Sequence, residues 1–101
     1  PRRARQVAMT SDPELLRMRE QMDDVNLRLV HVLHERARLS RRIGARKQTK
    51  ALTVIDPARE QEMLARLLRE LPPDGFSEAA LTSILRAVFA ASRDLVAAPN
   101  D

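Results

Sequence analysis

In the first half of the chain, apolar residues recur at alternating spacings of four and three, which is the period of one face of an α-helix. Between residues 14 and 48 the sequence has no proline and one glycine, so the pattern predicts a single long helix. Ser11-Asp12-Pro13-Glu14 indicates its start, because a capping residue precedes a first-turn proline and glutamate follows serine by three positions. The stripe breaks once, at Arg36, and otherwise consists of Met18, Met22, Val25, Leu29, Val32, Leu39 and Ile43.

A connector, residues 49–55, separates this helix from a second one. Asp56-Pro57 is typical of a helix start, with aspartate as the cap and proline at the first helical position. Pro72-Pro73-Asp74-Gly75 is expected to end the second helix. Its predicted apolar face comprises Met63, Leu64, Leu67, Leu68 and Leu71.

A third helix is expected to begin at the cap residue Ser77, with Phe76 placed to pack on Leu81. Ser92 interrupts its apolar stripe. These patterns, in a chain with only two glycines, predict an all-α fold of one long and two shorter helices. Residues 11–101 are expected to form a single helical domain that follows a flexible basic arm, residues 1–10. The stripe of the third helix consists of Leu81, Ile84, Leu85, Val88, Phe89, Leu95 and Val96.

The long helix is out of proportion to a chain of 101 residues. At 1.5 Å per residue it would extend about 55 Å, whereas a compact domain of this size has a radius of gyration of about 13 Å. The rest of the chain cannot cover the apolar stripe along that length. We therefore expect a second copy to cover it, in an intertwined homodimer.

Positive charge is concentrated in the first half of the chain. Residues 1–50 carry a formal charge of +7 and residues 51–101 one of −3, and 16 of the 18 basic residues are arginine. Because arginine can bind a carboxylate or phosphate through two parallel hydrogen bonds, an anionic ligand is expected. With only two aromatic residues, binding of single-stranded nucleic acid by base stacking is disfavoured.

The residues that several classes of protein function require are absent from this sequence. The chain has no cysteine, which excludes disulfides, thiolate metal sites and cysteine nucleophiles. No Ser-His-Asp arrangement or glycine-rich phosphate loop occurs, and His31, His34 and Glu35 make only a weak metal site, so we expect no metal and no cofactor. No apolar run reaches the length of a membrane span, and no signal peptide is recognisable. These features favour a cytoplasmic protein that does not bind membranes.

Arg36 and Ser92 are polar residues on otherwise apolar stripes. An unpaired buried charge costs several kcal/mol, so Arg36 is expected to pair with a carboxylate of the protein or with an anionic ligand. Ser92 either bonds back to its own helix or belongs to a site. Lys47 lies within about 20° of Arg36 around the helix, so the two share one face. Arg19 lies about 25 Å from Arg36 along the axis, and an antiparallel partner helix could bring both arginines to one small anion.

Two further groups of polar residues have alternative interpretations. Asp56, Arg59 and Glu60 cluster at the start of the second helix, where unpaired N–H groups attract anions, although Asp56 alone is interpreted as a cap. The segment 36–50 has seven basic residues and no acidic one. We interpret it as a solvated helix face. The alternative is a nucleic-acid-binding surface, with salt-sensitive binding that depends on Arg38, Arg41, Arg42 and Lys50.

Several short motifs occur in register along the chain. Residues 15–23 read Leu-Leu-Arg-Met-Arg-Glu-Gln-Met-Asp, and Glu35-Arg36, Ile43-Gly44-Ala45-Arg46-Lys47 and Asp56-Pro57-Ala58-Arg59-Glu60 follow. This order resembles the AroQ-type all-helical chorismate mutase family, whose pattern is L-R-x-x-I-D, E-R, I-x-x-x-K and D-x-x-R-E. The resemblance covers roughly residues 14–97 and implies an intertwined homodimer with two equal active sites.

The family's reaction is the Claisen rearrangement of chorismate to prephenate, which is unimolecular and needs no general acid, base, metal or nucleophile. The resemblance implies a small dicarboxylate substrate whose two carboxylates are bound by Arg36 of one chain and Arg19 of the other. In this arrangement Arg59 and Ser92 assist the two arginines.

The remaining carried-over roles concern the reacting bond and the ring. The resemblance implies that Lys47 faces the ether oxygen of the breaking bond, and that Asp56 and Glu60 face the substituent at C4 of the ring. Arg36, Lys47 and Glu60 are therefore the catalytic candidates.

Val96 departs from the family pattern, which has Gln or Glu four residues after Ser92 as a second hydrogen-bonding group for the ether oxygen. Losing one such donor can cost about 10²–10³ in rate. Three alternatives on the same scaffold therefore stay open: a 4-amino-4-deoxychorismate mutase of antibiotic biosynthesis, an isochorismate pyruvate lyase, and a weak mutase activated by a partner enzyme. An inactive dimerisation or regulatory domain is a fourth.

Overall fold

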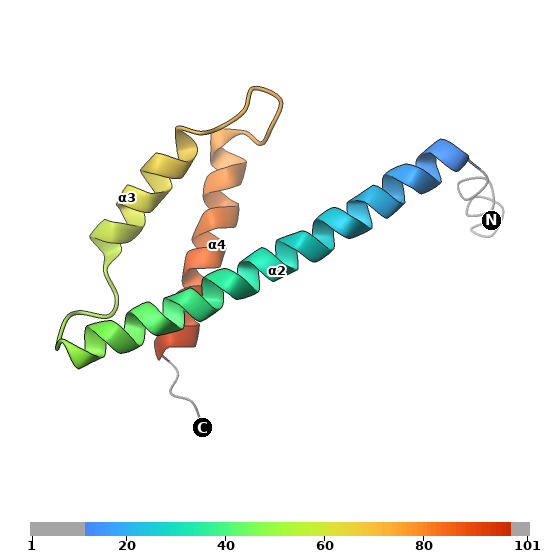
Figure 1. The fold of residues 1–101 in the computed structure, drawn as a ribbon. Coiled ribbons are helices and arrows are strands. Elements are labelled where there is room, and N and C mark those ends of the chain that lie inside the picture. The colour runs from blue at the N-terminus through green and yellow to red at the C-terminus, as the bar shows by residue number, and fades with distance from the viewer. Residues whose placement is uncertain (1–11, 98–101) are drawn as a thin grey trace, which may run out of the picture. The chain divides into compact units, whose positions relative to one another are not determined.

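The computed structural model describes residues 12–97, and the expected basic arm, residues 1–10, lies outside them. This part of the chain forms three helices and no strand: α2 (Pro13–Thr49), α3 (Pro57–Leu68) and α4 (Glu78–Ala97) (Figure 1). The predicted all-α fold of one long and two shorter helices is confirmed. Within the described residues, no helix is both long and apolar enough to cross a membrane. By internal packing the chain divides into two units, which meet between Glu35 and Arg36.

The first unit contains the amino-terminal part of α2. Asp12 caps this helix, because its Oδ1 accepts hydrogen bonds from the backbone N–H groups of Glu14 at 3.0 Å and Leu15 at 3.3 Å. Ser11, which the sequence offered as a cap, lies outside the described residues. Large apolar side chains of this unit are exposed in the single chain, among them Met22 at 58% and Leu29 at 53%.

The second unit begins with the carboxyl-terminal part of α2, which ends in a Schellman turn. The Leu52 N–H bonds to the Lys47 carbonyl oxygen at 2.7 Å, and the Ala51 N–H bonds to the Gln48 carbonyl oxygen at 3.1 Å. Ala51 has a φ of 56°, a left-handed conformation that costs a non-glycine residue about 1–2 kcal/mol. The turn leads into a connector, residues 52–56, which ends at the start of α3.

α3 begins where it was predicted to begin but ends earlier. Asp56 is the N-cap, and its Oδ1 accepts a hydrogen bond from the Arg59 N–H at 3.1 Å. The expectation that the helix reaches Leu71 is wrong, because α3 ends at Leu68 and residues 69–70 form a turn. A proline disfavours the α conformation of the residue before it, so Leu71 cannot continue a helix into Pro72.

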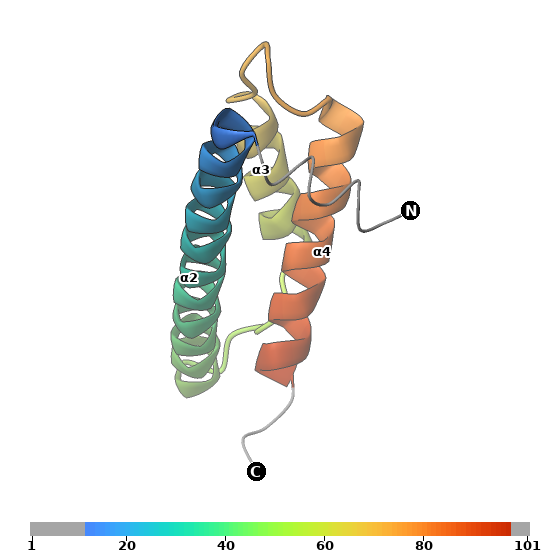
Figure 2. The same ribbon diagram turned by 90° about the vertical axis from the view of Figure 1, so that its right-hand side faces the viewer.

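α4 begins after Ser77, whose Oγ accepts a hydrogen bond from the Ala80 N–H at 3.2 Å, as the sequence predicted. Phe76, which was expected to pack on Leu81, remains 62% exposed. α3 and α4 pack against each other and run in opposite directions (Figures 1 and 2). Phe89 of α4, at 4% exposure, is the buried hydrophobic residue of the described chain.

Candidate active site

The second unit contains a cavity of about 420 Å³ between the end of α2, the connector, α3 and α4. This volume is typical of sites for small molecules. Seven of the predicted site residues line it, and the eighth, Arg19, belongs to the first unit. The seven are Arg36, Lys47, Asp56, Arg59, Glu60, Ser92 and Val96.

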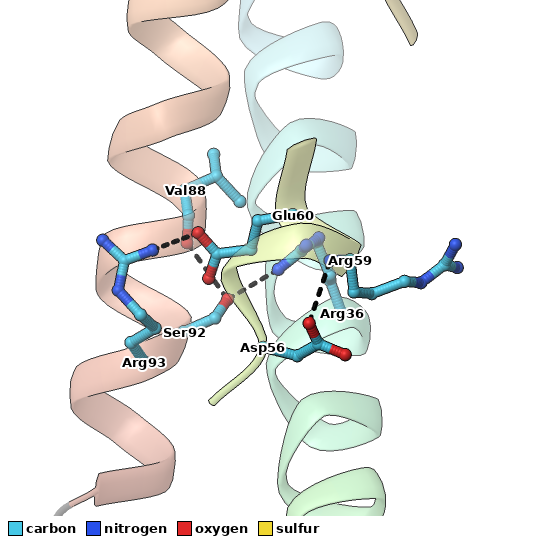
Figure 3. Close-up of polar contacts among 7 residues, drawn as sticks. All are labelled: Arg36, Asp56, Arg59, Glu60, Val88, Ser92 and Arg93. Carbon is cyan, nitrogen blue, oxygen red and sulfur yellow. Dashed lines mark hydrogen bonds and ion pairs between the residues drawn. The ribbon is translucent and has the colours of Figure 1, made fainter. Parts of the chain in front are cut away.

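Arg36 binds a hydroxyl group and an aromatic ring. Its Nη1 donates a hydrogen bond to Ser92 Oγ at 2.6 Å, and its guanidinium carbon lies 5.1 Å from the centroid of the Phe89 ring (Figure 3). Of the two partners that the sequence left open for Arg36, a carboxylate of its own chain is not found among residues 12–97. Because a guanidinium has five N–H donors, Arg36 can bind an incoming anion while it keeps its bond to Ser92.

Ser92 makes the bond back to its own helix that the sequence suggested, and it also contacts Arg36. Its Oγ donates a hydrogen bond to the Val88 carbonyl oxygen one turn earlier, at 3.0 Å, and accepts the one from Arg36 (Figure 3). With its proton committed to Val88, the hydroxyl presents its lone pairs to the guanidinium. Ser92 therefore holds Arg36 in place against α4.

Glu60 forms an ion pair across α3 and α4. Its Oε1 accepts a hydrogen bond from Nη1 of Arg93, and the side chains are 24% and 39% exposed, respectively (Figure 3). Sequence reasoning missed Arg93. A signal existed, because Arg93 precedes Val96 by three positions and so lies on the same side of the helix.

The remaining polar residues of the cavity differ in whether their side chains already have hydrogen-bond or ion-pair partners. Asp56 is engaged by its capping bond to the Arg59 N–H. The Arg59 side chain points away from the Arg36–Ser92 pair (Figure 3). Its Nη1 lies 3.9 Å from Oε2 of Glu62. Lys47 is half-buried in the lining, and its ammonium has no hydrogen-bond or ion-pair partner among residues 12–97.

Val96 and Gly44 close one wall of the cavity through a contact that leaves no room for a side chain on Gly44. A Cβ atom at Gly44 would lie 2.7 Å from Val96 Cγ1 and 3.7 Å from Val54 Cγ1. The valine branches at Cβ, so it cannot swing aside as a long flexible side chain could. The glycine is therefore required by the close approach of α4 to α2 in this unit.

We expect Gly44→Ala to lower the free energy of unfolding, although alanine favours the helix by about 1 kcal/mol. The reason is overpacking, which typically costs about 1–3 kcal/mol. Urea unfolding of Gly44→Ala, Val96→Ala and the double variant measures the coupling between the two positions. The double variant should be more stable than the sum of the single effects predicts, and strict additivity would show that this contact does not limit the packing.

The charges of the cavity favour an anionic ligand. Its lining contains four cationic side chains, Arg36, Lys47, Arg59 and Arg93, and two anionic ones, Asp56 and Glu60, which gives a formal net charge of +2. Guanidinium and ammonium groups suit carboxylates, and the apolar remainder of the lining, which includes Val54 and Met63, suits a hydrocarbon framework. The arrangement therefore suits a small organic anion.

Comparison with known proteins agrees with this chemistry. The chorismate mutase type II family matches residues 18–96. The chain is 33% identical over 85 residues to a bifunctional chorismate mutase/prephenate dehydratase of Aquifex aeolicus (strain VF5), which covers 81% of this chain and 24% of the relative. The chain thus spans about a quarter of the length of that curated relative.

Two solved structures of chorismate mutase from Thermus thermophilus have the same fold. Form II superimposes with a TM-score of 0.79 at 33% identity, covering 87% of this chain and 99% of the other. Form I superimposes with a TM-score of 0.74 at 34% identity, covering 78% of this chain and 98% of the other. The helical fold and the cationic cavity define an all-α enzyme domain with a binding cavity for a small molecule. The chain belongs to the type II chorismate mutase family, which is a family of isomerases.

Proposed function

We propose that this protein catalyses the rearrangement of chorismate to prephenate. The observation that carries the proposal is the cavity that gathers Arg36, Lys47 and Glu60 with four further residues predicted for the site from the sequence. In the reaction the ether C–O bond breaks while a C–C bond forms in the same molecule, so no proton, electron or water is exchanged. The protein has two tasks, which are to hold the reactive conformation and to stabilise the developing charge.

Arg36 and Lys47 divide these tasks. Arg36 binds a substrate carboxylate with the donors that Ser92 does not occupy, and so helps to hold the enolpyruvyl group over the ring. Lys47 places its ammonium beside the ether oxygen, where negative charge grows as the C–O bond breaks. The half-buried position of Lys47 in the cavity supports this role, because charge interactions strengthen as water is excluded.

Three acidic and basic residues at the start of α3 complete the substrate contacts. Glu60 and Asp56 face the C4 substituent of the ring, with the free oxygens of their carboxylates as acceptors. Arg59 assists at the carboxylates after its exposed side chain turns from Glu62 toward the cavity. Its ion pair at 3.9 Å is weak enough to break for that purpose.

The active assembly is an intertwined homodimer in which Arg19 of a second copy completes each site. Support comes from the exposed apolar side chains of the first unit, which is a surface of the kind that a second chain covers. Residues in this group include Leu16, Met18, Met22, Val25, Leu29, Val32 and Leu33.

The experiment that tests this function follows the loss of chorismate in the presence of the purified protein and identifies the product. Prephenate as the product supports the proposal. Conversion of 4-amino-4-deoxychorismate or isochorismate in its place would assign the cavity to one of the related reactions. If none of the three compounds reacts, even with an added partner enzyme, the proposal is overturned in favour of a regulatory domain.

Val96→Gln is expected to raise kcat for chorismate by about tenfold or more. This is part of the rate increase of about 10²–10³-fold that one preorganised hydrogen-bond donor can provide. The glutamine would supply a second N–H group to the ether oxygen from the cavity wall. Val96→Met, which has a similar length and no donor, is the matched control and should give no increase. Equal rates for Val96→Gln and the parent protein, with the fold intact, would contradict this role of the position.

A further inference from the structure

Both carboxylates of the cavity already accept a hydrogen bond from the protein. Asp56 accepts a hydrogen bond from the Arg59 N–H at the start of α3, where the helix has its partial positive charge. Glu60 accepts one from the guanidinium of Arg93. A ligand that enters this cavity therefore meets Glu60 as one half of an ion pair and Asp56 as a helix cap that is already hydrogen-bonded.

This state of Glu60 distinguishes between two kinds of ligand group. A hydroxyl needs only an acceptor lone pair, and the carboxylate keeps several of them while it binds Arg93. An ammonium needs the negative charge itself, because its loss of hydration must be balanced by a counter-ion. Beside an intact Glu60–Arg93 pair, an ammonium would also lie close to a second cation.

We propose that Arg93 is a specificity-determining residue that pairs with Glu60, so that the cavity selects a dicarboxylate with a hydroxyl at the ring position facing Glu60 over one with an ammonium there. This inference rests on the proposed function, which places that ring position beside Glu60. Arg93 acts through Glu60 and through the charge of the cavity, so it is a positioning residue.

The charge balance of the cavity also favours a ligand with a hydroxyl over one with an ammonium. The lining that this chain supplies has a formal net charge of +2 with Arg93 present, and Arg19 of the second copy would add one more cation, so the site favours a ligand with two negative charges. An ammonium on the ligand lowers the ligand's charge from −2 to −1 and leaves more of the positive charge of the site uncompensated. Removal of Arg93 lowers the lining to +1 and releases Glu60 to serve as the counter-ion of that ammonium.

The test compares kcat/KM and Kd for chorismate and for 4-amino-4-deoxychorismate, the analogue with an ammonium at C4. The parent protein should favour chorismate. In Arg93→Gln the ratio of the two kcat/KM values should move toward the amino compound by about fivefold or more, which corresponds to the upper range for a partly exposed ion pair. Arg93→Lys, which keeps the charge, should restore most of the original ratio.

Two further variants separate this effect from a general loss of structure. Arg38→Gln removes an equal charge from an exposed position outside the cavity and should leave the ratio unchanged. In a Glu60→Gln background the substitution Arg93→Gln should no longer move the ratio toward the amino compound, because the carboxylate that it would release is absent. Thermal unfolding of each variant checks that the fold is retained.

The possible outcomes distinguish a failure of the inference about Arg93 from a failure of the proposed function. If the parent protein converts chorismate and Arg93→Gln leaves the ratio unchanged, the inference about Arg93 is overturned and the proposed function stands. A parent protein that favours the amino compound while Arg93 is present overturns it as well. If the parent protein neither binds nor converts either compound, the proposed function fails, and the inference fails with it.

Discussion

Replacing Lys47 by alanine should lower kcat for chorismate by about 10²–10³-fold and leave the stability of the fold nearly unchanged. The size of the effect is that of losing one preorganised donor at a site of developing negative charge. In this protein the loss of kcat should lie at the upper end of that range, because Val96 occupies the position from which a second hydrogen-bond donor could compensate. Lys47 contributes little to stability, since its ammonium has no polar partner among residues 12–97.

The Lys47 experiment needs steady-state kinetics and urea unfolding on the same samples. Lys47→Met keeps much of the apolar stem and should lose as much activity as Lys47→Ala, which separates charge from packing. Lys50→Ala is the matched control, because this exposed lysine lies on the same segment and outside the cavity. A Lys47→Ala variant with near-parental kcat would remove the ammonium from the mechanism. A large loss of unfolding free energy would make its role structural.

The helices were predictable because each one satisfies a local rule. The spacing of apolar residues along α2 and α4 marks the faces that need burial, and the capping residues Asp56 and Ser77 act within three residues of their own position. The end of α3 shows where such rules compete. The apolar period continues to Leu71, but the restriction that Pro72 places on its neighbour overrides it.

The candidate site was predictable in its composition and less so in its pairings. Arg36 was recognisable as a residue in need of a partner, because a charge interrupts an apolar stripe. The identity of the partner depends on which side chain a different helix presents, and Ser92 lies 56 residues away in sequence. The Arg93–Glu60 pair joins residues 33 apart for the same reason. No local spacing indicates such contacts.

We expect the variants Arg19→Ala and Arg36→Ala to be nearly inactive when each is measured alone. When the two variants are unfolded together and refolded as a mixture, about a quarter of the parental activity should return. Random pairing of equal amounts makes about half of the dimers hybrid. In a hybrid dimer whose sites take Arg36 from one chain and Arg19 from the other, one site carries both substitutions and the second site carries neither. One complete site in half of the dimers gives the expected quarter.

A second mixture tests whether the recovery reports a shared site. Arg36 and Lys47 belong to the same chain of each proposed site, so hybrids of Arg36→Ala with Lys47→Ala contain no complete site and should remain inactive. Recovery in the first mixture and none in the second is the pattern that requires Arg19 from the partner. If Arg19 and Arg36 served one site from one chain, neither mixture would recover, because every hybrid site would still lack one of the residues substituted in that mixture. Sedimentation of each mixture establishes that dimers are present, so that absence of activity can be read as an incomplete site.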